Sequence, residues 1–195
     1  MISFAQWTSA LFAALVLQAP FAAGSLHAQD RQGNDTAGDW RPTHFERFDG
    51  WDSICDERGE DADLQMRCYV RYVDVFSPRP KFGAVFSFIT PEGRDGYKIE
   101  FGIEQGVRYR ADGFQIERGE EVVWTLPADC RRARPCLLEK KAATEFIDTV
   151  RAGGGNLIHR FTGRYGKAHD LAWPLAPLML ALDDFERAAA QRGLR

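Results

Sequence analysis

The stretch MRCYVRYV occupies residues 66–73 and follows the period-two pattern of a half-buried β-strand. We therefore expect a long strand here. The same kind of pattern recurs in other segments, which we also expect to be strands: residues 84–90, 97–103, 107–110, 114–117, 121–126, 156–161 and 169–173. Short strands at this spacing are typical of a β-sandwich.

Turn signals separate several of these strands. Residues 91–96 read PEGRDG, and a connection that contains proline and glycine predicts a hairpin between the strands on either side. Asp112-Gly113 predicts a second hairpin, because an Asp-Gly pair readily supplies the positive φ of a two-residue turn.

Two segments have the spacing of helices. Residues 140–151 place apolar side chains three and four positions apart and are followed by three glycines at residues 153–155, which predicts a helix with these ends. A second helix is expected to begin at Pro174 or Pro177 and to end at Gly193. Its apolar face contains Leu175, Leu178, Met179, Leu182, Phe185 and Ala189. The predicted fold class is mainly β: an antiparallel β-sandwich with two helices, one of them C-terminal.

The N-terminal segment has the features of a cleavable export signal. Residues 1–29 contain no Asp, Glu, Lys or Arg, and residues 11–17 form an apolar core. Small residues follow, as signal peptidase requires, and cleavage after Gly24 or after Ala28 fits this pattern. We favour Ala28, because the polar, charged chain begins there. We therefore predict a signal peptide at residues 1–28 and, after its cleavage, a location in the periplasm or, by secretion, at the outer envelope.

A permanent membrane anchor is the alternative interpretation of this segment. A membrane-spanning helix needs about 20 consecutive apolar residues, and Gln18 and Pro20 interrupt the run. We therefore expect no transmembrane segment in the mature chain. The polar residues 29–44 predict a flexible leader, and residues 45–195 predict one folded domain.

Charge and composition exclude one class of partner. The chain of 195 residues has a formal net charge of −3, and its acidic and basic residues are interspersed. A nucleic-acid-binding protein shows a basic patch or stripe instead. We therefore expect no nucleic-acid partner.

All four cysteines, Cys55, Cys68, Cys130 and Cys136, lie beyond the predicted cleavage site. An even number of cysteines in an oxidising compartment predicts two disulfides. Three connectivities are compatible with the sequence, and the entropy of loop closure does not choose among them. We favour Cys55–Cys68 with Cys130–Cys136, because each of these pairs brackets a polar, turn-like segment.

Arg131, Arg132 and Arg134 form a candidate anion-binding group between Cys130 and Cys136. Guanidinium groups bind phosphate and carboxylate well, and the same charges would lower the pKa of a nearby thiol. A solvated turn closed by a structural disulfide is the alternative interpretation.

The sequence assigns no catalytic residue, metal site or cofactor. His159, His169 and Asp170 lack the ligand spacing of zinc sites. No serine lies in the Gly-x-Ser-x-Gly context of a hydrolase nucleophile, and two disulfides would leave no free thiol. We therefore expect neither a metal nor a cofactor.

The mature chain carries an ordered series of landmarks: FDGWDSIC at residues 48–55, Cys68 followed by Tyr69, GVRYRADG at residues 106–113, LPADC at residues 126–130 and CLL at residues 136–138. A predicted helix, a glycine-rich turn and an apolar C-terminal helix come after them. This order resembles that of the invasion-associated locus B (IalB) family of exported bacterial proteins, from about Phe45 to Gln191. The chain departs from the family in a longer and more basic spacer at residues 131–135.

The resemblance implies an immunoglobulin-like β-sandwich in the periplasm or outer envelope, with a link to host-cell invasion. It implies no established catalytic residues, so none is assigned to this chain. We expect a protein that is not an enzyme but a binding or interaction module, with an envelope or host protein as its partner. The alternative is a periplasmic hydrolase or a thiol-redox accessory protein.

Overall fold

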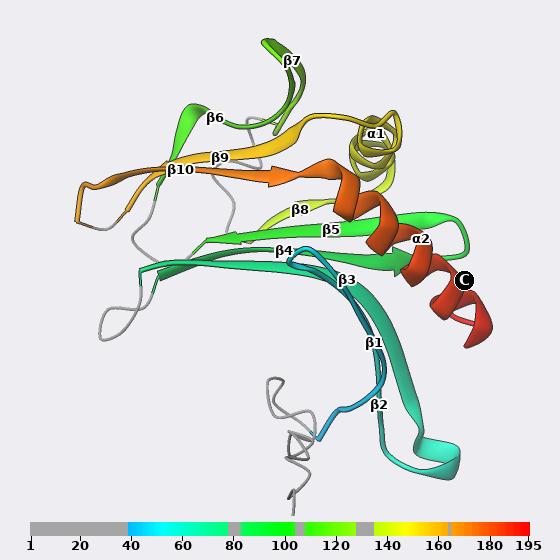
Figure 1. Ribbon diagram of the computed structural model, residues 1–195. Helices are drawn as coiled ribbons and strands as arrows, with labels where there is room; N and C mark the ends of the chain where they lie inside the picture. Colours follow the sequence, from blue (N-terminus) through cyan, green and yellow to red (C-terminus); the bar gives the residue numbers. More distant parts are fainter. Residues whose placement is uncertain (1–38, 78–82, 104–107, 128–134, 164) are drawn as a thin grey trace, which may run out of the picture. The chain divides into compact units, whose positions relative to one another are not determined.

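The computed structural model describes residues 39–77, 83–103, 108–127, 135–163 and 165–195. Within these ranges, ten strands form two antiparallel sheets, and two α-helices accompany them (Figure 1). The second helix is the last element of the chain. The predicted mainly β sandwich with two helices, one of them C-terminal, is therefore confirmed. The predicted signal peptide at residues 1–28 lies outside the described residues.

The larger sheet has six strands in the order β1-β2-β3-β4-β5-β8. Their bounds are Arg41–Phe48 for β1, Trp51–Arg58 for β2, Gln65–Ser77 for β3, Gly83–Glu92 for β4, Gly96–Ile103 for β5 and Cys136–Leu138 for β8. The strands predicted at residues 66–73, 84–90 and 97–103 correspond to β3, β4 and β5, and the first predicted hairpin joins β4 to β5. A short 3-10 helix, Asp61–Asp63, lies between β2 and β3.

The six-stranded sheet begins earlier in the chain than predicted. Residues 41–44, expected in a flexible leader, belong to β1, and Trp40 before them is already buried. The guanidinium carbons of Arg58 and Arg67 lie 4.7 and 3.9 Å from the centroid of its indole ring. The polar sequence of this segment concealed the strand, because β1 leaves most of its side chains exposed.

The connection between β1 and β2 is a two-residue hairpin turn that we did not predict. Asp49 and Gly50 both have positive φ, at 46° and 92°. Two consecutive positive φ values are the requirement of a type I′ turn, for which Asp-Gly is a preferred pair. The turn places Arg47 opposite Asp52 across the hairpin.

The smaller sheet has four strands in the order β10-β9-β6-β7. Their bounds are Arg108–Arg118 for β6, Glu121–Thr125 for β7, Asn156–Thr162 for β9 and Ala168–Pro174 for β10. The prediction of a hairpin at Asp112-Gly113 is wrong, because β6 runs through both residues as one strand. The pairing of β6 with β9 shifts between Tyr109 and Phe114, so residues 110–113 form a bulge opposite Arg160.

Gly113 is required at this bulge for space and not for a turn. A Cβ atom at this position would overlap the backbone oxygen of Arg160 on β9, and Gly113 lacks the positive φ of a hairpin turn. Glycine inside a strand often marks such a close approach of two backbones.

Gly113→Ala is expected to lower the free energy of unfolding by about 1–3 kcal/mol, the usual effect of overpacking. A backbone atom of a paired strand cannot move aside for the new methyl group. Gly102→Ala is the control, because a Cβ there meets the ring of Phe86, which is only half-buried and can turn away. Urea denaturation followed by circular dichroism measures both losses, and equal losses would contradict this explanation.

Helix α1 spans Lys140–Arg151, which is the predicted range. It packs against β5 and β7 with one side, whose buried residues are Ala143, Phe146, Ile147 and Val150. Three glycines with positive φ, residues 153–155, follow the helix. They turn the chain into β9, as glycines commonly do after a helix C-terminus.

Helix α2 spans Leu175–Gln191 and begins directly after Pro174. Its predicted apolar face is buried, except that Met179 is only partly buried. Gly193 follows the helix with a φ of 68°, as predicted for its end. The helix packs against β1, β2 and β3. Within the part of the chain that the structure describes, no helix has the length and apolarity needed to span a membrane.

The core joins the two sheets. Trp173 of β10 stacks on Tyr72 of β3 with ring centroids 4.1 Å apart and meets Trp51 of β2 edge-on at 5.8 Å. Phe101 of β5 meets Phe114 of β6 at 4.6 Å. The four-stranded sheet and both helices lie on the same side of the six-stranded sheet (Figure 1).

Candidate functional site

The six-stranded sheet has one face in the core and one face turned away from it. Trp51 and Tyr72 point into the core, so Asp52 and Arg71, the next residues along the same strands, point to the opposite side. We call this opposite side the outer face. No described helix or strand covers it (Figure 1).

A cleft of about 400 Å³ opens on the outer face. It is lined by side chains of β1, β2 and β3 and by the turn between the first two: Arg47, Gly50, Asp52, Arg71 and Val73. This volume lies within the range of small-molecule sites, roughly 300–1,000 Å³. We refer to these five residues as the arginine cleft.

Asp52 binds both arginines of the cleft. Its Oδ1 accepts a hydrogen bond from Arg47 Nε at 2.7 Å, and its Oδ2 accepts one from Arg47 Nη2 at 3.3 Å. Oδ2 also accepts a hydrogen bond from Arg71 Nε at 3.1 Å. The side chain of Asp52 is only 7% exposed, so the two guanidinium groups form the accessible part of the site.

The arginine cleft carries an excess of positive charge, because two guanidinium groups face one carboxylate. The hydrogen bond to Asp52, followed by the charge of Asp52, raises the pKa of Arg47, which therefore stays protonated. Among the described residues, no hydrogen bond uses Nη1 of Arg47 or either Nη atom of Arg71. These N–H groups remain available as donors to an anion.

The sequence contains a signal for this site that we did not use. If Asp49-Gly50 is recognised as a two-residue turn, Arg47 and Asp52 become cross-strand partners. The predicted pairing of Cys55 with Cys68 then sets a register between β2 and β3 in which Asp52 lies opposite Arg71. The three charged residues of the cleft follow from these two short-range features together.

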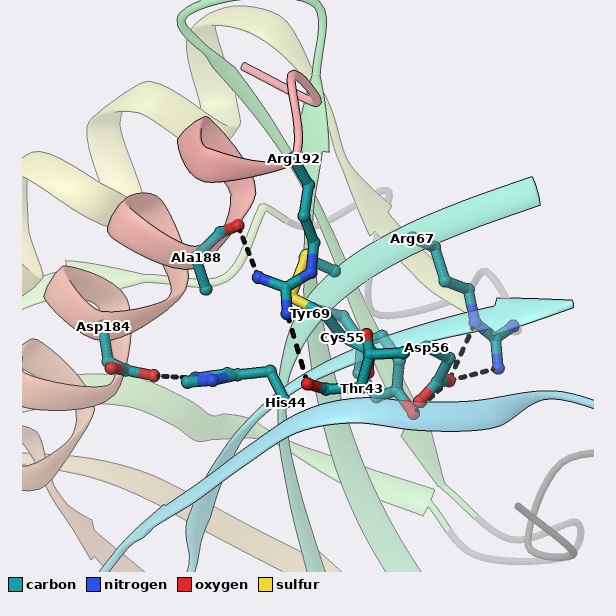
Figure 2. Close-up of a disulfide and its surroundings, with 10 residues drawn as sticks. Thr43, His44, Cys55, Asp56, Arg67, Tyr69, Asp184, Ala188 and Arg192 are labelled. Carbon is teal, nitrogen blue, oxygen red and sulfur yellow. Dashed lines mark hydrogen bonds and ion pairs between the residues drawn. A yellow bond between two sulfur atoms is a disulfide. The ribbon is translucent and has the colours of Figure 1, made fainter. Parts of the chain in front are cut away.

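Cys55 and Cys68 form a disulfide between directly opposite positions of β2 and β3 (Figure 2). The first predicted pair is therefore confirmed. The two cysteines are 0% and 1% exposed, which indicates a structural bond, since redox-active sulfurs are accessible. Cys136 is also disulfide-bonded, and Cys130 lies outside the described residues.

On the core side of this disulfide, α2 is tied to β1 (Figure 2). His44 Nε2 lies 2.6 Å from Asp184 Oδ2. Arg192 donates hydrogen bonds to the carbonyl oxygens of Ala188 at 2.9 Å and Thr43 at 3.3 Å. Burial alone would raise the pKa of Asp184, but its hydrogen bonds, first that with His44, outweigh burial and lower the pKa. This group fastens the helix to the sheet.

On the outer side of the same strands, Asp56 joins Arg67 and Tyr69 (Figure 2). Arg67 donates to Asp56 Oδ2 from Nη2 at 2.9 Å and from Nε at 3.1 Å, and the Tyr69 hydroxyl donates to it at 3.1 Å. Burial, followed by the charge of Asp56, raises the pKa of Tyr69 to about 12. One carboxylate thus matches one guanidinium, and this group has no excess charge to offer a ligand.

His159, His169 and Asp170 do not come together. His159 is buried between the rings of Phe114 and Trp173, with centroid distances of 4.4 and 3.9 Å. The ring of His169 stacks on a phenylalanine ring of β9, whereas Asp170 forms an ion pair with an arginine of the same strand. Within the described ranges, no three metal-ligating side chains converge.

Arg131, Arg132 and Arg134 lie outside the described residues. Anion binding at that position therefore stays a prediction. The arginine cleft is a different group, formed by strands instead of by the spacer between two cysteines.

Comparison of the chain with protein-family models, with curated proteins and with solved structures gives no match. The likeness to the invasion-associated locus B family therefore rests on the sequence landmarks alone, and the arginine cleft rests on the geometry of the described residues.

Proposed function

We propose that the chain is an exported, non-catalytic binding module of the invasion-associated locus B type that holds an envelope or host protein on its outer face. The arginine cleft carries this proposal. It is concave, its charge is unbalanced, and its two guanidinium groups are held in place by a buried carboxylate. Such a site supplies fixed donors for recognition, and it lies on a sheet face that no described element covers.

Apolar side chains on the outer face also support a binding role. Phe45 on β1 and Val73 on β3 are 48% and 46% exposed. A partner that covers these two side chains would remove their apolar surface from water.

Two features support export as part of the proposal. The uncharged segment with its apolar core at residues 11–17 and the small residues after it has the form of a signal peptide. The disulfide between Cys55 and Cys68 is of a kind that forms and persists in oxidising compartments. A partner in the envelope or on a host cell is consistent with both.

Val73→Glu tests whether the outer face is the binding surface. Val73 lines the arginine cleft. The new carboxylate would fill part of the cleft and neutralise its positive charge. Val122→Glu is the matched control, because Val122 is exposed to the same degree, 47% against 46%, but lies on β7 of the other sheet. Neither variant removes a hydrogen bond or an ion pair of a described side chain.

The experiment uses protein expressed as the full chain and recovered after export. It is immobilised and incubated with solubilised envelope at physiological salt, and the captured proteins are quantified by mass spectrometry. We expect at least one component that wild type and Val122→Glu retain and that Val73→Glu retains about tenfold less, a loss of about 1.4 kcal/mol. Capture that Val73→Glu leaves unchanged, or no capture by the wild type, would refute the proposal.

A further inference from the structure

We propose that the arginine cleft binds the oxyanion of an amphiphile. In this inference, which rests on the proposed binding role of the outer face, a phosphate or carboxylate group of the amphiphile lies on Arg47 and Arg71. The apolar part of the same molecule lies on Val73 and Phe45. The proposal follows from the free donors, the buried carboxylate that holds them, and the apolar side chains beside them.

The hydrogen-bond donors of the cleft are guanidinium N–H groups. Arg47 donates to Asp52 from Nε and Nη2, and Arg71 donates to it from Nε, so Nη1 of Arg47 and both Nη atoms of Arg71 stay available. An oxyanion that accepts from both arginines is bound by charge-assisted hydrogen bonds, which are stronger than neutral ones. A neutral headgroup would leave the excess positive charge of the cleft without a partner.

Asp52 has a positioning role. It accepts three hydrogen bonds from the two arginines while its own side chain is only 7% exposed. Holding two long side chains in one geometry before the ligand arrives lowers the entropy that binding must overcome. The carboxylate lines the cleft with little exposed surface, and its hydrogen bonds orient the two guanidinium groups.

The apolar contacts lie beside the two arginines. Val73 lines the cleft and follows Arg71 by two residues, so both side chains lie on the outer face. Phe45 precedes Arg47 by two residues, and its ring centroid is 5.4 Å from the guanidinium carbon of Arg47. An alkyl chain that leaves an oxyanion on the arginines would therefore cover apolar surface that is otherwise exposed to water.

Gly50 leaves room at one wall of the cleft. As a glycine it contributes only backbone to the lining, and its φ of 92° is one that favours glycine. No side chain therefore projects from this wall. The volume of about 400 Å³ accommodates a headgroup and several methylene groups.

Isothermal titration of the exported full-chain protein with octyl phosphate, kept below its critical micelle concentration, tests the inference. We expect saturable binding of one molecule per chain. Inorganic phosphate lacks the apolar part and is expected to bind more weakly, and neutral octyl glucoside is expected not to saturate. Octanoate forms the carboxylate arm, and the tighter of octanoate and octyl phosphate identifies the preferred oxyanion.

Arg71→Gln and Arg47→Gln are each expected to weaken the binding of octyl phosphate by about tenfold or more, because each removes a charged donor. Lys141→Gln, at an exposed position of α1, is the control for the loss of one positive charge and is expected to bind like wild type. Melting curves verify that the variants are folded. Unchanged affinity in both arginine variants, or octyl glucoside binding as tightly as octyl phosphate, would overturn the inference.

Asp52→Asn separates positioning from charge. Removing a carboxylate makes the cleft more positive, so attraction by net charge alone predicts tighter binding of octyl phosphate. Loss of the fixed guanidinium geometry predicts weaker binding, which we expect. Tighter binding would overturn the positioning role of Asp52.

The inference and the proposed function fail in different ways. If no amphiphile binds but Val73→Glu still abolishes capture of an envelope protein, the oxyanion inference is wrong and the binding module stands. If octyl phosphate binds through Arg71 but no envelope component is captured, the inference that the cleft binds an oxyanion stands and the protein-binding proposal is wrong.

Discussion

Trp173→Ala is expected to lower the free energy of unfolding by about 3–5 kcal/mol, the usual loss when a large buried aromatic side chain is truncated. Trp173 is fully buried and lies between the two sheets, where its ring contacts Tyr72, Trp51 and His159. Its Nε1 also donates a hydrogen bond to Asp74 Oδ2 at 3.1 Å. Truncation would remove these contacts and leave a cavity at the centre of the sandwich.

Trp173→Phe separates packing from hydrogen bonding. A phenyl ring retains part of the aromatic contact and loses the bond to Asp74, so we expect a smaller loss that includes about 0.5–1.5 kcal/mol for the hydrogen bond. Urea denaturation followed by far-ultraviolet circular dichroism measures both variants. If the alanine variant is no less stable than the phenylalanine variant, then Trp173 does not join the sheets in the way described.

Acidification is expected to destabilise the protein through His159. Burial lowers the pKa of His159 from 6.5 to about 3. Between these two values, the unfolded chain binds a proton at this position and the folded chain does not. The free energy of unfolding therefore decreases as the pH falls below about 6.5, with a slope that approaches 1.4 kcal/mol per pH unit, and this contribution is constant at higher pH.

His159→Phe is expected to remove this slope while it keeps a ring between Phe114 and Trp173. Denaturation curves between pH 7.5 and 5 measure the effect, because the lowered pKa values of Asp184 and Glu117 affect stability chiefly at lower pH. His169→Gln is the control. Burial and the charge of a nearby lysine also lower the pKa of His169, but it is partly exposed, so its contribution to the slope is smaller. A slope that persists in the phenylalanine variant would contradict this assignment.

Elements with strong local signals could be predicted from the sequence. Helix α1 has the predicted bounds because its apolar spacing and the glycines after it act over a few residues. The same is true of α2, which starts after Pro174 and is followed by Gly193. Strands β3 and β4 extend beyond their predicted ends by one to four residues, and β5 begins one residue earlier than predicted, since pairing with a neighbour can continue past the alternating pattern.

The two Asp-Gly pairs show what local signals do not decide. Asp49-Gly50 makes a hairpin turn, whereas Asp112-Gly113 lies inside a strand. The dipeptide permits positive φ but does not require it. What distinguishes the second pair is the backbone of Arg160, which belongs to a strand about 50 residues later and approaches Gly113 too closely for any side chain.

The candidate site was missed for a related reason. Arg47, Asp52 and Arg71 belong to three different strands, and each residue alone has the appearance of an ordinary exposed charge. Only the register of the strands brings them together, and the register depends on a turn and a disulfide. The predicted arginine group, by contrast, drew attention because its members are adjacent in sequence.

The attachment of α2 to β1 has a consequence for the order of folding. His44 and Asp184 are 140 residues apart in sequence, and Arg192 reaches Thr43 across 149 residues. Contacts between such distant segments form slowly, because a long loop must close before they are gained. The first strand therefore acquires its helix only after the C-terminal segment has been synthesised. A chain that delays its final packing in this way stays competent for translocation in the unfolded state. This suits a protein that must cross a membrane before it folds, as we propose for this one.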